Sequence, residues 1–488
     1  MAPDEVRRER DHDLAVTARP SPTREVFGGS ARVFVAEAIS LPTGLITAAF
    51  LARRFGPSGY GVFTLTMAIL VWLEWSLASL LARPAVKLIA DANEWRPVSA
   101  MVLRTYLVTG LVGFTALYVA AGPLARLMHE PSLTRHLRVL AFDVPLFMAT
   151  QAHQQVLVGT GAYACRATVA AWRWLARMVL VLTLVGAGRS IDGAFAAIVG
   201  ASVLELVVAR RYVQASFRGG SAADARTMWR YAFPLFAAAI SLRLFDKLDL
   251  FVLKALGGSD ALVGLYGGAQ NLAIIPNLIA LSMTTLLLST LSRTLRVGDT
   301  ESARVLAENV LRGVLVLFPF AGVAAGASTA LSTMIYGTEF AGAGPLLSVL
   351  IFASMMMAVV AVASAILTAA GRPGWAMAAA LPVAPLALVG HLLVIPHFGA
   401  RGATVVTLVV AAVGAGLSLV AVSQAWRVHV PWATVARVAA ATTLTTTVAT
   451  RWKTAGALTL VEIGVMSVVA TAALIVLGEL TPPRREPR

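Results

Sequence analysis

Charged side chains stand inside long apolar stretches of this chain, at positions where a charge is costly. The densest group consists of Arg243, Asp246, Lys247 and Asp249. In a helix, Arg243 and Lys247 are four residues apart and share a face, with Asp246 on the adjoining strip. They would supply fixed positive charge, and arginine can grip phosphate oxygens with two hydrogen bonds. This pair is the first candidate for binding a pyrophosphate, and a buried ion pair between Arg243 and Asp246 is the structural alternative.

A second basic pair, Arg173 and Arg177, has the same spacing on one helix face. Arg32 enters the first apolar stretch of the chain. These three arginines extend the set of candidate phosphate ligands. For Arg173 and Arg177 the structural alternative is that the long side chains reach the polar membrane surface. Arg173 fits this alternative better, because it lies nearer the end of its stretch.

Carboxyl groups inside the apolar stretches could carry a coupling ion. Glu74 is the best candidate by depth, since a buried carboxyl group can load and release a proton. The alternative for Glu74 is a hydrogen bond to a neighbouring helix. Glu37, Asp246 and Asp249 are further coupling residues or charge partners of the basic groups.

Polar uncharged residues in these stretches are weaker candidates. Gln270, Asn271 and Asn277 could bind sugar hydroxyls, although such amides more often join neighbouring helices. His391 stands alone in an apolar stretch and is interpreted as packing. Asp143 and Glu205 are embedded nearer the ends of their stretches, and the sequence assigns them no role.

The composition indicates that the protein resides in a lipid bilayer. The 488 residues are 58% hydrophobic and 13% charged, whereas a soluble domain carries roughly a quarter charged residues. Stretches of the roughly 20 apolar residues that cross a bilayer recur along most of the chain. The net charge of +15 resides in the turns between them, which argues against nucleic-acid binding. A single cysteine excludes an intrachain disulfide framework.

The pattern predicts an all-α membrane protein with about 14 transmembrane helices. We expect these at residues 30–52, 61–87, 101–122, 137–158, 166–186, 191–211, 230–256, 261–291, 306–330, 345–369, 374–396, 402–426, 432–450 and 456–478. Lys and Arg gather in the turns on the side of both termini, which predicts a plasma (inner) membrane protein with cytoplasmic termini. The opposite turns are short, so we expect no external catalytic domain.

Two sequence echoes indicate an internal duplication. Residues 51–61 return in altered form at 253–267, each ending a helix in a basic residue and turning at glycine before a Tyr-Gly pair. Residues 188–194 compare in the same way with 399–403. An even number of predicted helices separates equivalent turns, so the halves run in the same direction through the membrane. Parallel repeats of this kind are one plan of secondary transporters.

Three segments carry a resemblance to a known family. They are residues 54–61 (RFGPSGYG), residues 246–249 (DKLD) followed by 263–266 (VGLY), and residues 336–340 (YGTEF). Their order and spacing resemble the Wzx-type polysaccharide flippases of the multidrug/oligosaccharidyl-lipid/polysaccharide exporter superfamily. The resemblance implies a MATE-like fold of two parallel six-helix lobes around a cavity, plus two extra helices. It also implies a non-enzymatic carrier that moves a polyprenyl-pyrophosphate-linked oligosaccharide to the outer leaflet by alternating access.

The implied organisation divides the chain into six parts. They are a disordered cytoplasmic tail (1–29), an N-lobe (30–211), a cytoplasmic loop (212–229), a C-lobe (230–426), two extra helices (427–480) and a second cytoplasmic tail (481–488). The expected partners are a lipid-linked glycan and membrane lipids, with a polysaccharide polymerase and chain-length proteins as further candidates. We expect no cofactor or metal, and a proton or sodium ion could couple transport.

Two other functions remain open. A multidrug or cation antiporter of the same architecture would suit an acidic or neutral cavity, and the basic residues at 173, 177, 243 and 247 argue against it. A multi-span polysaccharide polymerase or glycosyltransferase typically carries a large external loop, whereas the predicted external turns are short.

Overall fold

The computed structural model describes most of the chain. The described residues are 24–188, 190–214, 228–229, 245–275, 287, 290–291, 293–295, 297–426, 432–452, 454–456 and 458–479, with side chains from residue 39 onward. They form helices and connecting turns, and these ranges contain no strand. The predicted all-α class is therefore confirmed. Eight helical stretches within the ranges are long and apolar enough to cross a membrane, while the total of 14 stays a prediction.

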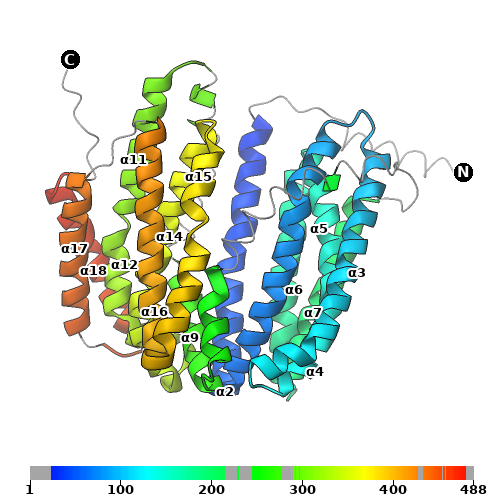
Figure 1. The fold of residues 1–488 in the computed structure, drawn as a ribbon, viewed down its shortest axis with the longest axis horizontal. Helices are drawn as coiled ribbons and strands as arrows, with labels where there is room; N and C mark the ends of the chain where they lie inside the picture. Colours follow the sequence, from blue (N-terminus) through cyan, green and yellow to red (C-terminus); the bar gives the residue numbers. More distant parts are fainter. Residues whose placement is uncertain are drawn as a thin grey trace, which may run out of the picture. The chain divides into compact units, whose positions relative to one another are not determined.

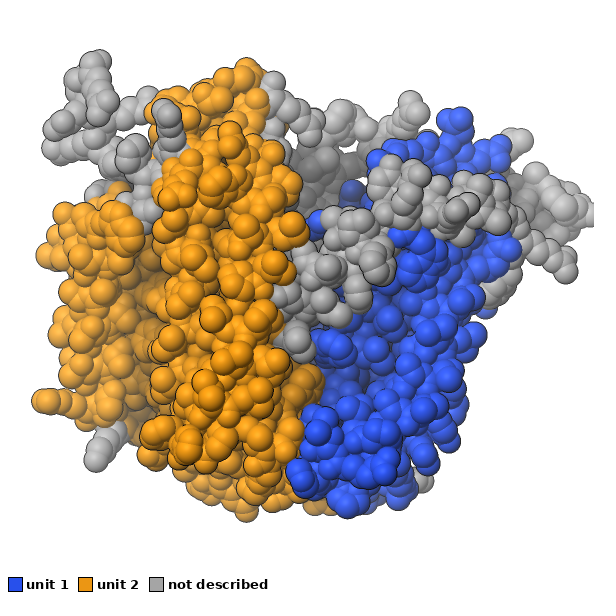
Figure 2. All heavy atoms as spheres, viewed as in Figure 1, with its two compact units in different colours: residues 1–50, 66–239 blue, residues 51–65, 240–488 orange. Residues whose placement is uncertain are grey.

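The chain divides into two compact units (Figure 2). Unit 1 comprises Met1–Phe50 and Thr66–Ala239, and unit 2 comprises Leu51–Leu65 and Ile240–Arg488. The long helix α2 (Arg24–Ala90) contributes to both units. The segment in its middle therefore packs with helices that lie about 200 residues later in the sequence.

Unit 1 is a helical bundle (Figure 1). Besides parts of α2 it contains α3 (Trp95–Leu127), α4 (Ser132–Ala141), α5 (Asp143–Gly159), α6 (Tyr163–Gly186) and α7 (Ile191–Tyr212). α3 packs on α4 and α5, and α7 packs on α5 and α6. The shared core buries Leu81, Tyr106 and Phe147 completely. It fixes the four helices that carry the charged residues of this unit.

Unit 2 contains most of the remaining helices. They are α9 (Asp260–Ala273), α11 (Thr300–Leu315), α12 (Phe318–Gly326), α13 (Ser328–Tyr336), the 3-10 helix η1 (Thr338–Ala343), α14 (Gly344–Ala369), α15 (Pro373–Ala380), α16 (Val383–Trp426), α17 (Trp432–Arg451) and α18 (Leu458–Val476). Residues 245–255 are also helical. α14 is central, because it packs on α9, α12 and α16.

The echoing turns share a backbone conformation. In the first echo Gly56 and Gly257 have positive φ angles of 64° and 89°. In the second echo Gly188 and Gly399 have φ angles of 87° and 56°. Side chains with a Cβ rarely adopt this region, so the conformation requires glycine. At Gly56 and Gly399 the turn is only a break inside a long helix, α2 or α16, where the sequence predicted two separate helices.

The two segments of the first echo also contact each other within unit 2. A Cβ placed on Gly61 would lie 1.9 Å from the carbonyl oxygen of Asp260, and one on Gly264 would lie 2.0 Å from that of Pro57. The contact is reciprocal. Gly61 faces the carbonyl four residues before Gly264, and Gly264 faces the carbonyl four residues before Gly61. This reciprocal contact is the arrangement of two helices related by a local two-fold axis, and it supports the predicted duplication.

A buried carboxylate ties the two C-terminal helices to the rest of unit 2. Glu479, just after α18, accepts a 2.7 Å hydrogen bond from Arg312 Nε on α11. On α17, Arg437 Nη1 donates to it at 3.0 Å and Thr434 Oγ1 at 2.9 Å. Burial alone would raise the pKa of Glu479, but the hydrogen bonds from these three residues hold that pKa below its usual value.

The close helix contact predicts that residue 264 tolerates only glycine. We expect Gly264→Ala to lower the free energy of unfolding by about 1–3 kcal/mol, because the methyl group would overlap backbone atoms. The matched control is Gly416→Ala on α16, where no atom lies within 4 Å of the added Cβ. Thermal unfolding of both variants in detergent measures the difference, and equal melting temperatures would contradict the contact.

The Glu479 cluster predicts a specific pH dependence. A carboxylate whose pKa is lowered by folding stabilises the protein above its unfolded-state pKa, near 4.5, and loses this effect as the pH falls through the folded-state value. We therefore expect Glu479→Gln to lower the melting temperature at neutral pH and to match the unchanged protein in acid. Glu301→Gln is the control. Glu301 is exposed, and its ion pair with Arg304 is long, at 3.9 Å. A difference in melting temperature between Glu479→Gln and the unchanged protein that stays the same at every pH would contradict a stabilising role of the ionised Glu479 carboxylate.

Candidate functional site

Unit 1 gathers five ionisable side chains in its interior. They are Glu74 on α2, Asp143 on α5, Arg173 and Arg177 on α6, and Glu205 on α7. The three carboxylic residues are almost completely buried. The charges of both arginines act on Glu74, as does that of Asp143. The helix bundle therefore brings together groups that are spread over 130 residues of sequence.

Arg173 is held inside the bundle. Its Nε lies 3.6 Å from Glu205 Oε2, its side chain is 17% exposed, and its guanidinium stacks 4.8 Å from the centre of the Phe147 ring. Glu205 in turn accepts a 3.0 Å hydrogen bond from Gln154. The interpretation that Arg173 extends to the membrane surface is therefore wrong, because a buried carboxylate and an aromatic face hold it inside.

Arg177 has a different environment one helical turn away. It is half-buried, and its Nη2 lies 4.0 Å from the sulfur of Met67. Within the described ranges no carboxylate lies at ion-pair distance from its guanidinium, although Glu74 and Asp143 act on it electrostatically. Arg177 thus keeps hydrogen-bond donors available, whereas Arg173 is already paired.

Glu74 and Asp143 form the least satisfied part of the cluster. Both side chains are buried, and they interact electrostatically. Oε1 of Glu74 and both carboxyl oxygens of Asp143 have no hydrogen-bond partner among the described residues. Buried polar groups in folded proteins are usually hydrogen-bonded, so this pair requires an explanation of its own.

Unit 2 contains a buried carboxyl group, that of Asp249, which has several hydrogen-bond donors around it. Asp249 accepts hydrogen bonds from Tyr266 Oη at 2.7 Å, Gln270 Nε2 at 2.8 Å and the backbone N–H of Leu250 at 2.8 Å. Thr407 Oγ1 lies a further 3.2 Å from Oδ2. Asp249 is therefore fixed in place by donors from the helix of residues 245–255, α9 and α16.

The basic and amide candidates of unit 2 adjoin Asp249. Lys247 Nζ donates to Gln270 Oε1 at 3.1 Å, so Gln270 links the ammonium group to the Asp249 carboxyl. Asn271 donates a 3.0 Å hydrogen bond to the Tyr60 hydroxyl. Asp246 is exposed. The structure thus places Lys247 beside Asp249, and it engages both described amides in contacts between helices.

The three segments that carry the family resemblance meet in unit 2. The ring of Tyr60 packs against Tyr336 and Phe340 at centroid distances of 5.9 and 5.7 Å. Tyr336 also donates to the carbonyl of Gly268 at 3.3 Å. Arg53 caps this arrangement by donating to the carbonyl of Ile335 at 3.0 Å. The aromatic residues of these segments therefore build the packing of the unit, and Tyr60, Tyr336 and Phe340 are buried.

Several predicted residues lie outside the described part of the chain. Arg243 and Asn277 are outside it entirely, and for Arg32 and Glu37 only the helical backbone of α2 is described. Their predicted roles stay predictions. In the described ranges no group of three or more His, Cys, Asp or Glu side chains could hold a metal ion.

Sequence reasoning missed four residues of these clusters: Asp143, Glu205, Tyr266 and Thr407. The two acids carried a usable signal, since each is a charge in an apolar stretch. Tyr266 stood in the segment 263–266 that carries the family resemblance, but nothing in the sequence linked it to Asp249. Thr407 carried no signal, because threonine is ordinary in membrane helices. His391, interpreted as packing, is buried with an unpartnered Nδ1 among the described residues and interacts electrostatically with Asp249.

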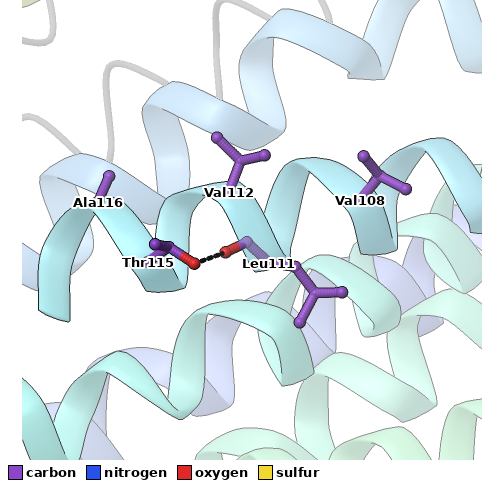
Figure 3. Close-up of a pocket in the computed structure, with 5 residues that line it drawn as sticks. All are labelled: Val108, Leu111, Val112, Thr115 and Ala116. Carbon is purple, nitrogen blue, oxygen red and sulfur yellow. Dashed lines mark hydrogen bonds between the residues drawn. The ribbon is translucent and has the colours of Figure 1, made fainter.

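A shallow hollow lies on α3. It has a volume of 510 Å³ and is lined by Val108, Leu111, Val112, Thr115 and Ala116. All five come from one helix, and the Thr115 hydroxyl is already bonded to the Leu111 carbonyl (Figure 3). This hollow is therefore not a candidate site.

The sequence itself identifies the family. Residues 29–294, more than half of the chain, match the family described as "Polysaccharide biosynthesis protein". The chain belongs to this family. The resemblance predicted from residues 54–61, 246–249, 263–266 and 336–340 is thereby confirmed. A search of curated protein sequences found no match.

Solved transporters share the fold of this polysaccharide biosynthesis protein. A structure described as "Lipid II flippase MurJ, inward closed conformation" matches with a TM-score of 0.80 and 13% identity, over 92% of this chain and 99% of that chain. An inward-facing multidrug resistance MATE family transporter matches with a TM-score of 0.59 and 15% identity, over 88% of this chain and 98% of that chain. A MOP superfamily transporter from Pyrococcus furiosus matches with a TM-score of 0.58 and 13% identity, over 87% of this chain and 97% of that chain. At these identities the likeness shows the fold alone, and it confirms the predicted MATE-like class.

The Asp249 network predicts the effect of losing one donor. We expect Tyr266→Phe to lower the free energy of unfolding by about 1.5–3 kcal/mol, the usual contribution of a hydrogen bond to a charged group. Tyr163→Phe is the control, since Tyr163 is 51% exposed. Thermal unfolding in detergent compares the two variants. Equal stability would mean that the remaining donors fully compensate for the lost hydroxyl.

Proposed function

We propose that this protein is a flippase for a polyprenyl-pyrophosphate-linked oligosaccharide. In this proposal the cargo moves from the cytoplasmic to the outer leaflet of the plasma membrane by alternating access and serves cell-surface polysaccharide biosynthesis. Membership of the polysaccharide biosynthesis family and a fold shared with a lipid II flippase support a lipid-linked substrate. The observation that carries the proposal is a guanidinium, inside an apolar helix, that has no carboxylate at ion-pair distance among the described residues.

That guanidinium belongs to Arg177. It lies 14 residues into α6, or about 21 Å along the helix axis from Tyr163. A pyrophosphate entering such an environment exchanges its water for fixed donors, and arginine can supply two parallel hydrogen bonds. Arg173 supports it from the same helix face, although Glu205 neutralises it. We therefore place the headgroup contact of unit 1 at Arg177.

The other ligands remain part of the proposal. Lys247 offers a second cation, in unit 2, whose present partner is the neutral amide of Gln270. Arg243 and Arg32 are proposed with it, and Gln270, Asn271 and Asn277 are proposed to bind sugar hydroxyls. Glu74, Glu37, Asp246 and Asp249 remain candidates for proton or sodium coupling or for charge pairing.

A multidrug or cation antiporter is the second candidate. Three buried carboxyl groups in unit 1, those of Glu74, Asp143 and Glu205, would suit a cationic cargo. MATE transporters also share the fold. Raised drug resistance in efflux-deficient cells that express the protein, with surface polysaccharide independent of it, would favour this function over the flippase.

The cellular setting follows from the same proposal. The helices and the transporter fold identify a multi-pass membrane protein. We propose that it resides in the inner membrane with both termini in the cytoplasm, and that a polysaccharide polymerase and chain-length proteins act beside it. Family and fold neighbours are transporters and flippases, which fits a protein without catalytic chemistry.

Substitution of Arg177 tests the flippase. We expect Arg177→Ala to weaken headgroup binding roughly 10- to 100-fold, because a hydrogen bond between charged groups is worth about 1.5–3 kcal/mol. Arg177→Lys should give an intermediate loss, since lysine keeps the charge without the two-pronged geometry. The measurement is surface polysaccharide per amount of carrier in cells that lack the original gene.

Arg451→Ala is the matched control, because Arg451 is an exposed arginine at the end of α17. It should support normal polysaccharide. Undiminished polysaccharide in Arg177→Ala as well would contradict a headgroup site at this residue.

A further inference from the structure

Unit 2 holds a lysine close to an acid without joining the two in an ion pair. Lys247 and Asp249 lie on the same helix, that of residues 245–255. Side chains two residues apart in a helix point in different directions, so these two do not face each other. Among the described residues no carboxyl oxygen lies at ion-pair distance from Lys247 Nζ, which instead donates to Gln270 Oε1 at 3.1 Å. A neutral amide therefore separates the ammonium group from the Asp249 carboxyl group.

The amide of Gln270 has only one favourable orientation between these two groups. Its Nε2 donates to Asp249 Oδ1 at 2.8 Å, and its Oε1 accepts from Lys247. An ionised carboxylate can only accept hydrogen bonds, and an ammonium group can only donate them. The reversed amide would set two acceptors against each other at Asp249 and two donors against each other at Lys247. The two charged groups thus determine which way the amide points.

Asp249 is itself fixed by contacts that do not involve the lysine. Its side chain is buried, and it accepts hydrogen bonds from Tyr266 at 2.7 Å and from Thr407 at 3.2 Å. These donors come from α9 and α16, so the carboxyl group is held between helices. A series of fixed positions therefore runs from Asp249 through Gln270 to the ammonium group of Lys247.

The ammonium group keeps its capacity to bind an anion. Lys247 is half-buried, and one of its three N–H donors is used by Gln270. The side chain of a lysine is flexible, and ordering it during binding costs free energy. A hydrogen bond that already holds the ammonium group in place reduces this cost. The arrangement therefore suits the binding of an anionic group.

We propose that Gln270 is a positioning residue for Lys247: oriented by Asp249, it holds the ammonium group outside an ion pair and in place for an anionic oxygen of the cargo. This inference rests on the proposed flippase function, in which the anionic group is the pyrophosphate. Without the amide, Lys247 would lose its fixed position and would be free to turn toward the Asp249 carboxyl group. Gln270 thus acts on the headgroup through Lys247, and its remaining donor and acceptor positions stay available to a sugar hydroxyl.

A double-mutant cycle on the purified full-length protein in detergent tests this role. The probe is a polyprenyl pyrophosphate without sugars, so a direct contact of Gln270 with sugar does not contribute. A polyprenol of the same chain length, which has no anionic group, is the reference ligand. Binding of both is measured for the unchanged protein, Lys247→Met, Gln270→Met and the double variant. Methionine is unbranched like both residues but supplies no hydrogen-bond donor.

We expect Lys247→Met to weaken binding of the pyrophosphate probe roughly 10- to 100-fold, because a hydrogen bond between charged groups is lost. Gln270→Met should weaken it roughly 3- to 30-fold when Lys247 is present and have no further effect when Lys247 is absent. A residue that acts only through another contributes nothing once that other residue is gone. Gln424→Met is the control, since Gln424 is exposed on α16, and it should bind like the unchanged protein.

Three results would overturn the positioning role. Gln270→Met may not lower the affinity at all, Lys247→Met may not lower it, or Gln270→Met may lower it equally with and without Lys247. The last result would mean that Gln270 acts directly or through the general structure of unit 2. Size-exclusion profiles verify folding of each variant, and Gln270→Leu takes the place of Gln270→Met if the latter does not fold.

The same measurements separate this inference from the flippase proposal. An unchanged protein that binds the polyprenyl pyrophosphate no better than the polyprenol has no headgroup site, and both proposals then fail. A clear preference for the pyrophosphate that is lost in Arg177→Ala, together with equal effects of Gln270→Met with and without Lys247, would overturn only the positioning role.

Discussion

A charge kept away from water must be compensated by groups in contact with it, and this constraint shapes the interior of both units. The interaction between two opposite charges is strong where the dielectric constant is low, but the cost of dehydrating each is larger still unless the geometry is good. Unit 1 meets the constraint with two arginines among three carboxyl groups. Unit 2 meets it at Asp249 with neutral donors and one lysine beyond them.

These two solutions leave different groups free to act. Every described contact of Asp249 uses a donor on a neighbouring helix or its own backbone, so this carboxyl group holds the helices together. Arg173 is likewise committed, to Glu205 and to the Phe147 ring. Among the described residues, Arg177 has no carboxylate at ion-pair distance, and three of the four carboxyl oxygens of Glu74 and Asp143 have no hydrogen-bond partner. Arg177 is therefore the residue of unit 1 to which the proposed function assigns the binding of an anion.

The residues that reveal the family are largely not the ones that suggest its chemistry. Tyr60, Tyr336 and Phe340 pack together, and Gly61 lets α2 meet α9 at backbone contact. Such positions tolerate little change, because a core has no room for a different shape. A ligand site can differ between carriers of different cargo, so its residues need not form a family motif. The same fold accordingly occurs in a structure described as a lipid II flippase and in one described as a multidrug resistance transporter.

The sequence by itself determined the solvent, the helical class, the turns with special glycines and the family, because each depends on composition or on short spacings. It also located Glu74, Arg173, Arg177, Lys247 and Asp249 as charges in apolar surroundings. Only the tertiary structure decided which of them meet, since that depends on how α2, α5, α6 and α7 pack across 130 residues. It paired Arg173 with Glu205, left Arg177 unpaired among the described carboxylates, and buried Glu74 and Asp143 within the same unit. Spacing along one helix cannot reveal such contacts, because the groups that compensate a buried charge come from other helices.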